Sequence, residues 1–263
     1  MNFKERLKLV NSILIDCPYD TQKEEIIELF EKTKNNVRKD ILCRLATIDG
    51  YYSTNMNRRL FGFEELADLI LDLEKNNKLK NINVTNFIND NLTKNGLLRS
   101  IGIDKKGEPG GHAFSLITKY IYFRTKFNFP IYDRLVFKGL KEEDLITGTQ
   151  APKLNYFLPL VKIKAEYNIS FDELDKYYWI CGKVREGSLS LLISDSKSYV
   201  NGYLKKLNLN KTERALNSVE FSNMLAKKLV SEKEWFDNPK LKQIQKLARS
   251  IKNERVFKNL KSK

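Results

Sequence analysis

The sequence predicts an all-α fold that carries a basic helical appendage at its C-terminal end. Apolar residues recur at steps of three and four over most of the chain, which is the spacing of one buried helix face. No segment shows the sustained alternation of apolar and polar residues that is typical of a half-buried strand. Positive charge gathers from Lys205 onward, where 16 basic residues stand against 6 acidic ones. We therefore expect a helical domain over residues 1–203 and the appendage over 204–263.

Amphipathic helices are expected along the N-terminal part of the chain. The first should end before Pro18, because proline disfavours helix continuation. Thr21-x-x-Glu24 has the form of a capping box, so the second helix is expected to begin there. The apolar faces are Phe3, Leu7, Val10 and Leu14 in the first helix, Ile26, Ile27 and Phe30 in the second, Ile41, Leu42, Leu45 and Ile48 in the third, and Phe63, Leu66, Leu69, Ile70 and Leu73 in the fourth.

Two breaks divide the rest of the chain. Gly102–Gly111 contains four glycines and a proline, which predicts a loop, and a helix is expected directly after it. Ser170-x-x-Glu173 is a second capping box and predicts another helix start. A further break lies near Gly187–Asn201. Beyond it, a basic amphipathic helix is indicated by the apolar stripe Leu241, Ile244, Leu247, Ile251 and Leu260.

Composition argues against several classes of protein. No apolar run approaches the roughly 20 residues that span a bilayer. The N-terminus begins an amphipathic pattern rather than the apolar stretch of a signal peptide. Three scattered cysteines and a single histidine form neither a disulfide framework nor a zinc site, and we expect Cys17, Cys43 and Cys181 to be buried. The sequence therefore predicts a cytoplasmic protein without metal, cofactor or membrane contact.

The basic charge indicates a polyanionic partner. A net charge of +14 concentrates polyanions at the surface, and contacts to phosphate release counterions. The alternative is a lysine content inherited from an AT-rich genome, which needs no ligand. If the charge serves binding, Lys242, Lys246 and Arg249 of the appendage are candidate DNA contacts.

The segment from Pro109 to Val136 carries the candidate chemistry. A glycine-rich turn before a helix leaves backbone N–H groups free for a phosphate. Helical spacing places Ser115 and Lys119 on one face, and the loop containing Pro130 returns Asp133 towards that face. The candidate DNA contacts at the turn and the helix start are Gly110, Gly111, His112 and Ser115.

This order of turn, helix and Pro-x-x-Asp resembles the helix-hairpin-helix superfamily of base-excision DNA glycosylases. The closer likeness is to bacterial proteins with an 8-oxoguanine DNA glycosylase (OGG) fold. The resemblance covers roughly residues 38–185, whereas the first 37 residues and everything after about 200 lie outside it. It rests on Tyr51-Tyr-Ser-Thr-Asn55, on Phe-Ser-Leu-Ile-Thr-Lys119 joined to Phe-Pro-Ile-Tyr-Asp133, and on Leu174-Asp-Lys-Tyr-Tyr-Trp-Ile-Cys-Gly-Lys183.

The resemblance implies roles for Asp133 and Lys119. In that superfamily the loop aspartate stabilises the developing oxocarbenium ion or helps to activate the nucleophile, and a helix lysine, where present, attacks C1′. Asp133 matches the aspartate. Ser115 stands 18 residues before it, a spacing common in the adenine-glycosylase branch, and Lys119 lies one turn later. Either Lys119 is the amine, or the protein is monofunctional and Lys119 contacts phosphate or base. The sequence Pro109-Gly-Gly-His112 also departs from the usual Gly-x-Gly hairpin.

A glycosylase also needs a pocket for a base that has left the stack, built from aromatic faces and a few polar groups. Each proposed site residue has a structural alternative: Asp133 as the cap of a helix at Arg134, Lys119 as a solvated lysine, and the aromatic residues as core. The candidate base-pocket residues are Tyr51, Tyr52, Asn55, Tyr132 and Trp179.

The sequence therefore predicts a DNA glycosylase-like enzyme that binds duplex DNA, flips a modified base and cleaves its N-glycosidic bond, in repair or in anti-phage defence. A lyase activity accompanies it if Lys119 is the nucleophile. One alternative is a non-catalytic nucleic-acid-binding module of the same fold. Another is a scaffold whose basic C-terminal helix docks on an acidic partner or an anionic membrane.

Overall fold

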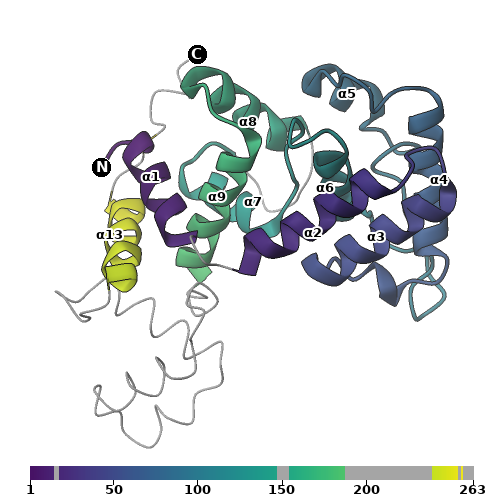
Figure 1. The fold of residues 1–263 in the computed structure, drawn as a ribbon, viewed down its shortest axis with the longest axis horizontal. Helices are drawn as coiled ribbons and strands as arrows, with labels where there is room; N and C mark the ends of the chain where they lie inside the picture. The colour runs from purple at the N-terminus through teal and green to yellow at the C-terminus, as the bar shows by residue number, and fades with distance from the viewer. Residues whose placement is uncertain (15–17, 147–153, 187–238, 254–255, 257–263) are drawn as a thin grey trace, which may run out of the picture. The chain divides into compact units, whose positions relative to one another are not determined.

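A computed structural model describes residues 1–14, 18–146, 154–186, 239–253 and 256 of the chain. Over these residues the prediction of an all-α protein is confirmed, since all regular structure is helical and no strand is present. The helices are α1 (Phe3–Leu14), α2 (Pro18–Lys32), α3 (Arg38–Tyr52), η1 (Met56–Arg58), α4 (Gly62–Lys75), α5 (Val84–Asn91), α6 (Phe114–Arg124), α7 (Arg134–Glu142), α8 (Leu154–Tyr167), α9 (Phe171–Glu186) and α13 (Pro239–Asn253) (Figure 1).

The chain forms two compact units that do not follow chain order. We call the first the terminal unit; it consists of Met1–Asp20, Arg134–Thr147 and Lys176–Lys263. The second, the central unit, consists of Thr21–Asp133 and Gly148–Asp175. The predicted boundary between residues 203 and 204 and the predicted break near Gly187–Asn201 lie outside the described residues.

The central unit is built around α6. Nine of the eleven residues of this helix are buried, which is expected of a helix surrounded by its neighbours. Helix α3 packs against α4 and α6, and α5 packs against α8. A buried guanidinium from α3 ties down the end of α2, because Arg44 donates to the carbonyls of Phe30 and Thr33 at 3.2 and 2.7 Å. Because most of α6 is buried, the side chain of Lys119 in its middle is enclosed by protein.

The glycine-rich loop before α6 is an ordered platform. Isolated bridges join Leu60 to Ile103, Ile103 to Pro109 and Ser100 to His112. Gly102 has a φ of +70°, and a Cβ there would lie 2.8 Å from the carbonyl oxygen of Leu60. The loop therefore needs glycine at residue 102 for both its conformation and its close approach to the segment before α4.

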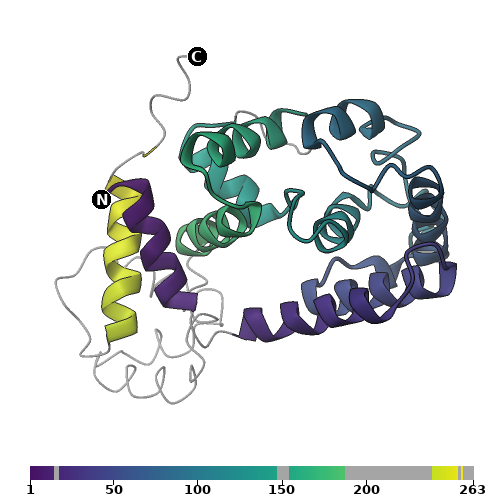
Figure 2. The ribbon, with the colours of Figure 1, turned by 45° about the horizontal axis from the view of Figure 1, so that its top comes forward.

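The terminal unit joins the two ends of the chain. Helix α13 lies beside α1 in Figures 1 and 2, and the two helices are in contact. Arg6 is fully buried and donates to the Ser250 carbonyl at 2.9 Å and to Glu143 at 3.2 Å. Ile244, Leu247 and Ala248 of α13 are buried as well. The described part of the predicted appendage is thus a helix packed into this unit.

Two local predictions are confirmed. Phe3, Leu7, Val10 and Leu14 form the buried face of α1, as the spacing predicted. Ser170 and Glu173 form the expected capping box, in which the Ser170 amide donates to the Glu173 carboxylate at 2.8 Å and the Glu173 amide donates to the Ser170 hydroxyl at 3.1 Å. Helix α9 begins directly after Ser170, as this motif requires.

Two other local predictions are wrong. Helix α2 begins at Pro18, so Thr21 lies inside the helix and cannot be its N-cap. Proline suits the first helical position because its missing N–H would have no helical partner there. Cys43 is exposed although Cys181 is buried as expected, and the side chain of Cys17 lies outside the described residues. Cys43 follows buried Ile41 by two positions, which places it on the opposite side of α3.

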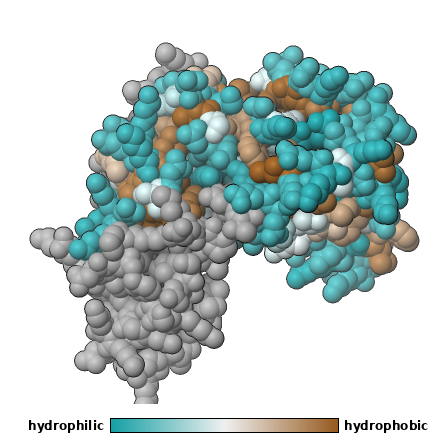
Figure 3. Space-filling model, viewed as in Figure 1, coloured by the Kyte–Doolittle hydropathy of each residue, from teal (hydrophilic) through white to brown (hydrophobic). Residues whose placement is uncertain are grey.

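None of the helices in the described ranges is both long and apolar enough to cross a bilayer. The face in Figure 3 is largely hydrophilic over the described residues, with apolar patches between. Among these residues, the exposed large apolar side chains are Val37, Tyr51, Leu60 and Phe61.

Candidate active site

Lys119 extends from the buried middle of α6. Its side chain is 2% exposed, and its ammonium group donates a hydrogen bond to Ser115 Oγ at 2.7 Å. The two residues are one helical turn apart, as the sequence predicted. The ring of Tyr52, at the end of α3, lies 5.4 Å from Nζ, within the range of a cation–π interaction. Lys119 is therefore held in one position by two neighbouring helices.

Asp133 is delivered by the segment that follows α6. The Tyr132 amide donates to the hydroxyl of Thr118 on α6 at 3.0 Å. On the other side, the Tyr156 hydroxyl donates to the Ile131 carbonyl at 2.7 Å and accepts from the Asp133 amide at 3.3 Å. Because hydrogen bonds to α6 and α8 hold this segment, the backbone position of Asp133 is fixed. Helix α7 begins at the next residue.

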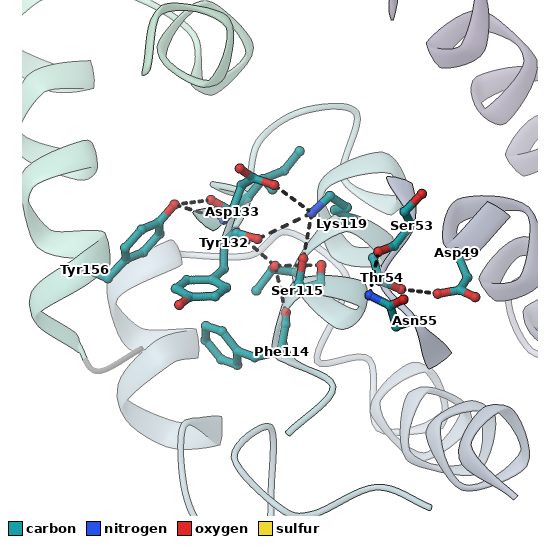
Figure 4. Close-up of polar contacts among 12 residues, drawn as sticks. Asp49, Ser53, Thr54, Asn55, Phe114, Ser115, Lys119, Tyr132, Asp133 and Tyr156 are labelled. Atoms are coloured by element: carbon teal, nitrogen blue, oxygen red, sulfur yellow. Dashed lines mark hydrogen bonds and ion pairs between the residues drawn. The ribbon is translucent and has the colours of Figure 1, made fainter. Parts of the chain in front are cut away.

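The structure brings Lys119 and Asp133 together. Asp133 Oδ2 lies 3.6 Å from Lys119 Nζ, and Nζ is also 3.5 Å from the Tyr132 carbonyl oxygen (Figure 4). The side chain of Asp133 is 27% exposed, whereas that of Lys119 is 2% exposed. The pair thus has an enclosed amine on one side and a solvent-accessible carboxylate on the other.

Aromatic side chains pack together beside the segment that carries Asp133. The half-buried ring of Tyr132 packs edge-on against Phe114 at 5.2 Å and against Tyr156 at 4.9 Å. Burial raises the pKa of the Tyr132 hydroxyl, and the charge of Asp133 adds to this rise. Burial likewise raises the pKa of Tyr156 well above its ordinary value. Both phenols therefore stay protonated at neutral pH, and Tyr156 acts as a hydrogen-bond donor to the segment that carries Asp133.

The turn after α3 lies beside Lys119, and an unpredicted carboxylate shapes it (Figure 4). Asp49 is buried and accepts hydrogen bonds from the amides of Met56 and Asn57 at 2.9 and 3.2 Å. Ser53 and Asn55 both adopt positive φ, at 48° and 63°. Sequence reasoning missed Asp49, because its partners stand seven and eight residues further on and no local motif marks such a bond.

Of the four predicted base-pocket residues in the central unit, two lie beside the ion pair and two are exposed with other partners. Tyr52 is half-buried beside Lys119, and Tyr132 is half-buried beside Asp133. Tyr51 is exposed and bonds to Glu25, and Asn55 is exposed with its amide group donating to the Ser53 carbonyl at 3.1 Å. The structure therefore gathers two of these four aromatic or polar residues against the ion pair.

The glycine turn differs in part from its predicted form. The Gly110 amide donates to the Gly102 carbonyl at 2.7 Å, so the prediction that this turn leaves its N–H groups free is wrong at Gly110. Arg59 donates to the carbonyls of Gly111 and Ile101 and braces the turn from the side. Burial lowers the pKa of Arg59, while the charge of Asp49 opposes that change. Gly111 and His112 are exposed.

The remaining predicted contacts belong to the terminal unit. Trp179 is half-buried there, and Lys183 Nζ lies 5.2 Å from its ring. On α13, Lys242 and Lys246 are exposed and Arg249 is half-buried. Lys119 and Asp133 of the central unit, by contrast, lie within one compact unit and require no second unit to meet.

The donor set at the site is not that of a metal centre. Within the described ranges, no group of three or more histidine, cysteine, aspartate or glutamate side chains is placed to hold a metal ion. The chemistry available at Lys119 and Asp133 is that of an amine beside a carboxylate, which can exchange a proton, stabilise a cation or attack a carbon centre.

Comparison with known proteins gives the chain no relative: no protein-family model, no curated protein and no solved structure matches it.

Proposed function

We propose that the protein is a DNA glycosylase-like enzyme of the helix-hairpin-helix type, with Lys119 and Asp133 as its reactive pair. The observation that carries the proposal is their 3.6 Å approach, with the amine enclosed and the carboxylate open to solvent. Residues fourteen positions apart meet only because α8 and α6 both hold the segment before α7. An amine used only for solubility would lie on the surface instead.

The reaction follows from the two functional groups. A lysine acts as a nucleophile in its neutral form. The Lys119 amine would attack C1′ of the target nucleotide, and the bond from C1′ to the base would break with its electron pair leaving on the base, which takes up a proton. Loss of the amine protons and opening of the sugar ring would leave an imine between Nζ and C1′. Asp133 would stabilise the positive charge that develops at C1′.

Neighbouring groups support this assignment. Ser115 accepts a hydrogen bond from the Lys119 ammonium at 2.7 Å and orients it. Tyr52 and Tyr132 supply aromatic surface beside the pair, of the kind that receives an extruded base. The net charge of +14 favours a polyanionic substrate. In the monofunctional form of the proposal, water attacks C1′ and Lys119 contacts phosphate or base.

A second candidate is a nucleic-acid-binding module of the same fold that carries out no reaction. Two observations favour it. The Lys119 ammonium already has polar partners in Ser115, Asp133 and the Tyr132 carbonyl, so it can serve as an internal tether. The Gly110 amide is bonded within the loop and does not present itself to a phosphate.

Borohydride trapping on DNA separates the two candidates. The probes are duplexes that each contain one 8-oxoguanine, hypoxanthine, uracil or abasic site. For the bifunctional enzyme, borohydride reduces the imine and leaves a protein–DNA adduct, which Lys119→Ala abolishes. Lys39→Ala removes an exposed lysine from the start of α3 and should trap as well as the parent protein.

The carboxylate provides the second test. Asp133→Asn keeps the shape of the side chain and removes its charge, so base release should fall by about a hundredfold or more, equivalent to about 3 kcal/mol. Base release without an adduct, lost in Asp133→Asn, indicates the monofunctional enzyme. Duplex binding with neither release nor adduct across the whole panel indicates the binding module and overturns the enzyme.

A further inference from the structure

A polar cavity lies at the far end of α6 from the glycine turn. Its volume is about 650 Å³, within the range of small-ligand sites. It belongs to the central unit and shares no lining residue with the Lys119–Asp133 pair. Its walls are the segment between α4 and α5, the first turn of α5, the end of α6, and one side of α8 with Phe171.

The charged residues that line this cavity are all cationic. Lys80, Lys126 and Lys164 line it together with Arg124, and no aspartate or glutamate is among the lining residues. Arg124 is held in place by Glu74, which accepts from its Nε at 2.6 Å and from a terminal nitrogen at 3.1 Å. The three lysines therefore place positive charge on a concave surface whose lining contains no carboxylate, and such a surface attracts an anion.

An aromatic hollow shares a wall with this cavity. It has a volume of about 290 Å³ and also uses Arg124 and Lys126. Its apolar lining includes Phe30, Phe123 and Phe127, and Glu31 and Asn35 stand among the polar residues. Aromatic faces beside polar groups are the usual surroundings of a bound nucleobase.

The residues that join the two hollows have strained backbones. Lys126 and Phe127 both adopt the left-handed conformation, with φ of 50° and 68°. For non-glycine residues this conformation is strained, and it persists where the surroundings impose it. Hydrogen bonds from Lys126 N to the Phe123 carbonyl at 3.1 Å and from Phe127 N to the Tyr122 carbonyl at 2.8 Å hold it in place. Lys126 therefore lines both hollows, and the adjacent Phe127 supplies a ring to the aromatic hollow.

From these observations we infer a nucleotide-binding site at the C-terminal end of α6, separate from the Lys119–Asp133 pair. The phosphate lies in the cationic cavity among Lys80, Lys126 and Lys164. The base lies in the aromatic hollow against the half-buried ring of Phe127. The ligand is a nucleoside 5′-phosphate, either free or as one unit of a single-stranded nucleic acid.

Calorimetric titration of the full chain tests this site. The probes are deoxyadenosine 5′-monophosphate, deoxyadenosine and inorganic phosphate. The monophosphate should bind at least about tenfold more tightly than either fragment, because it reaches both hollows. Lys80→Ala combined with Lys164→Ala should weaken its binding by about tenfold or more, since charge-assisted hydrogen bonds to phosphate are stronger than neutral ones.

Matched variants exclude loss of fold and general charge effects. Lys39→Ala combined with Lys105→Ala removes the same charge from exposed positions outside both hollows and should leave the affinity within about twofold. Phe127→Leu should weaken the monophosphate but not inorganic phosphate. Thermal unfolding of each variant is first followed by circular dichroism. A loss of affinity in a variant that is still folded is then assigned to the site.

Competition with an oligonucleotide identifies the source of the nucleotide. A 5′-phosphorylated single-stranded oligonucleotide that displaces the monophosphate, and that loses affinity in the Lys80/Lys164 variant, identifies a nucleic-acid strand. A monophosphate that the oligonucleotide fails to displace identifies a free nucleotide. No binding of either, or equal binding to the parent and the Lys80/Lys164 variant, overturns the site. Lys119→Ala should leave this binding unchanged, so that failure of the glycosylase proposal is distinguishable from failure of this one.

Discussion

Two ion pairs, one from each unit, differ in how completely protein encloses them. In the terminal unit, Arg6 and Glu143 are 0% and 4% exposed and lie 3.2 Å apart. In the central unit, Lys119 and Asp133 are 2% and 27% exposed and lie 3.6 Å apart. Glu143 also accepts hydrogen bonds from the Tyr177 hydroxyl at 3.3 Å and from the Val256 amide at 2.9 Å.

Under the proposed function, this difference separates a structural pair from a reactive one. A guanidinium stays charged at any ordinary pH and bonds along several fixed directions, which suits a permanent connection between chain segments. An ammonium can lose its proton, and the resulting amine is a nucleophile. Because Asp133 is open to solvent on one side, a substrate can reach the carboxylate end of that pair, whereas the Arg6–Glu143 pair has no such opening.

The largest expected effect is at the enclosed pair. Arg6→Met leaves the Glu143 carboxylate buried without its cation, and we expect the free energy of unfolding of the terminal unit to fall by about 3–5 kcal/mol. Urea unfolding followed by tryptophan fluorescence in a Trp235→Phe background, where Trp179 of that unit is the single reporter, measures the loss. The double variant Arg6→Met/Glu143→Leu should recover part of it, since both charges are then gone. A single variant as stable as the parent protein would show that this pair does not hold the unit together.

A smaller effect is expected at alkaline pH in the central unit. Burial raises the pKa of Tyr120 to about 12, whereas an unfolded tyrosine ionises near 10. The unfolded chain therefore loses the Tyr120 proton at a lower pH than the folded chain does. The contribution of Tyr120 to the free energy of unfolding is fully present below about pH 10 and is lost between about pH 10 and 12. For Tyr120 alone the loss is about 3 kcal/mol.

Tyrosinate absorbance during a pH titration checks this prediction. Burial also raises the pKa of Tyr122 and Tyr156 in the central unit, and of Tyr177 in the terminal unit. The central unit should therefore open first, in a step that coincides with late tyrosine ionisation. Tyr51→Phe removes an exposed phenol and should leave that step unchanged. Ionisation of every tyrosine near pH 10 without loss of helix would contradict the prediction.

The local parts of this architecture could be read from the sequence, and the nonlocal parts could not. Helical spacing predicted that Ser115 lies one turn from Lys119, because both residues belong to the same element. The hydrogen bonds that hold the segment before α7 run from the Tyr132 amide to Thr118 and from the Asp133 amide to Tyr156 on a different helix. No sequence pattern marks such pairs, since their separation in the chain is arbitrary.

The two capping boxes show why even a local pattern is insufficient. Ser170-x-x-Glu173 forms its reciprocal hydrogen bonds, but Thr21-x-x-Glu24 does not mark a helix start, because Pro18 has already begun that helix. A capping motif specifies a start only where no earlier residue provides one. Similarly, the exposure of Cys43 follows from which face of α3 is covered, and residue type alone does not determine this.

The smallest expected change in stability is at the reactive pair itself. Lys119→Met fills the same volume without charge, and Asp133, already 27% exposed, can be solvated when its partner is lost. We therefore expect the free energy of unfolding of the central unit to fall by only about 1 kcal/mol. Helix melting by circular dichroism measures this change, with Lys39→Met as the exposed control. A fall in the free energy of unfolding as large as that of Arg6→Met would show that both pairs have a structural role. A stable Lys119→Met protein with no borohydride adduct would instead separate the chemistry of this pair from the fold around it.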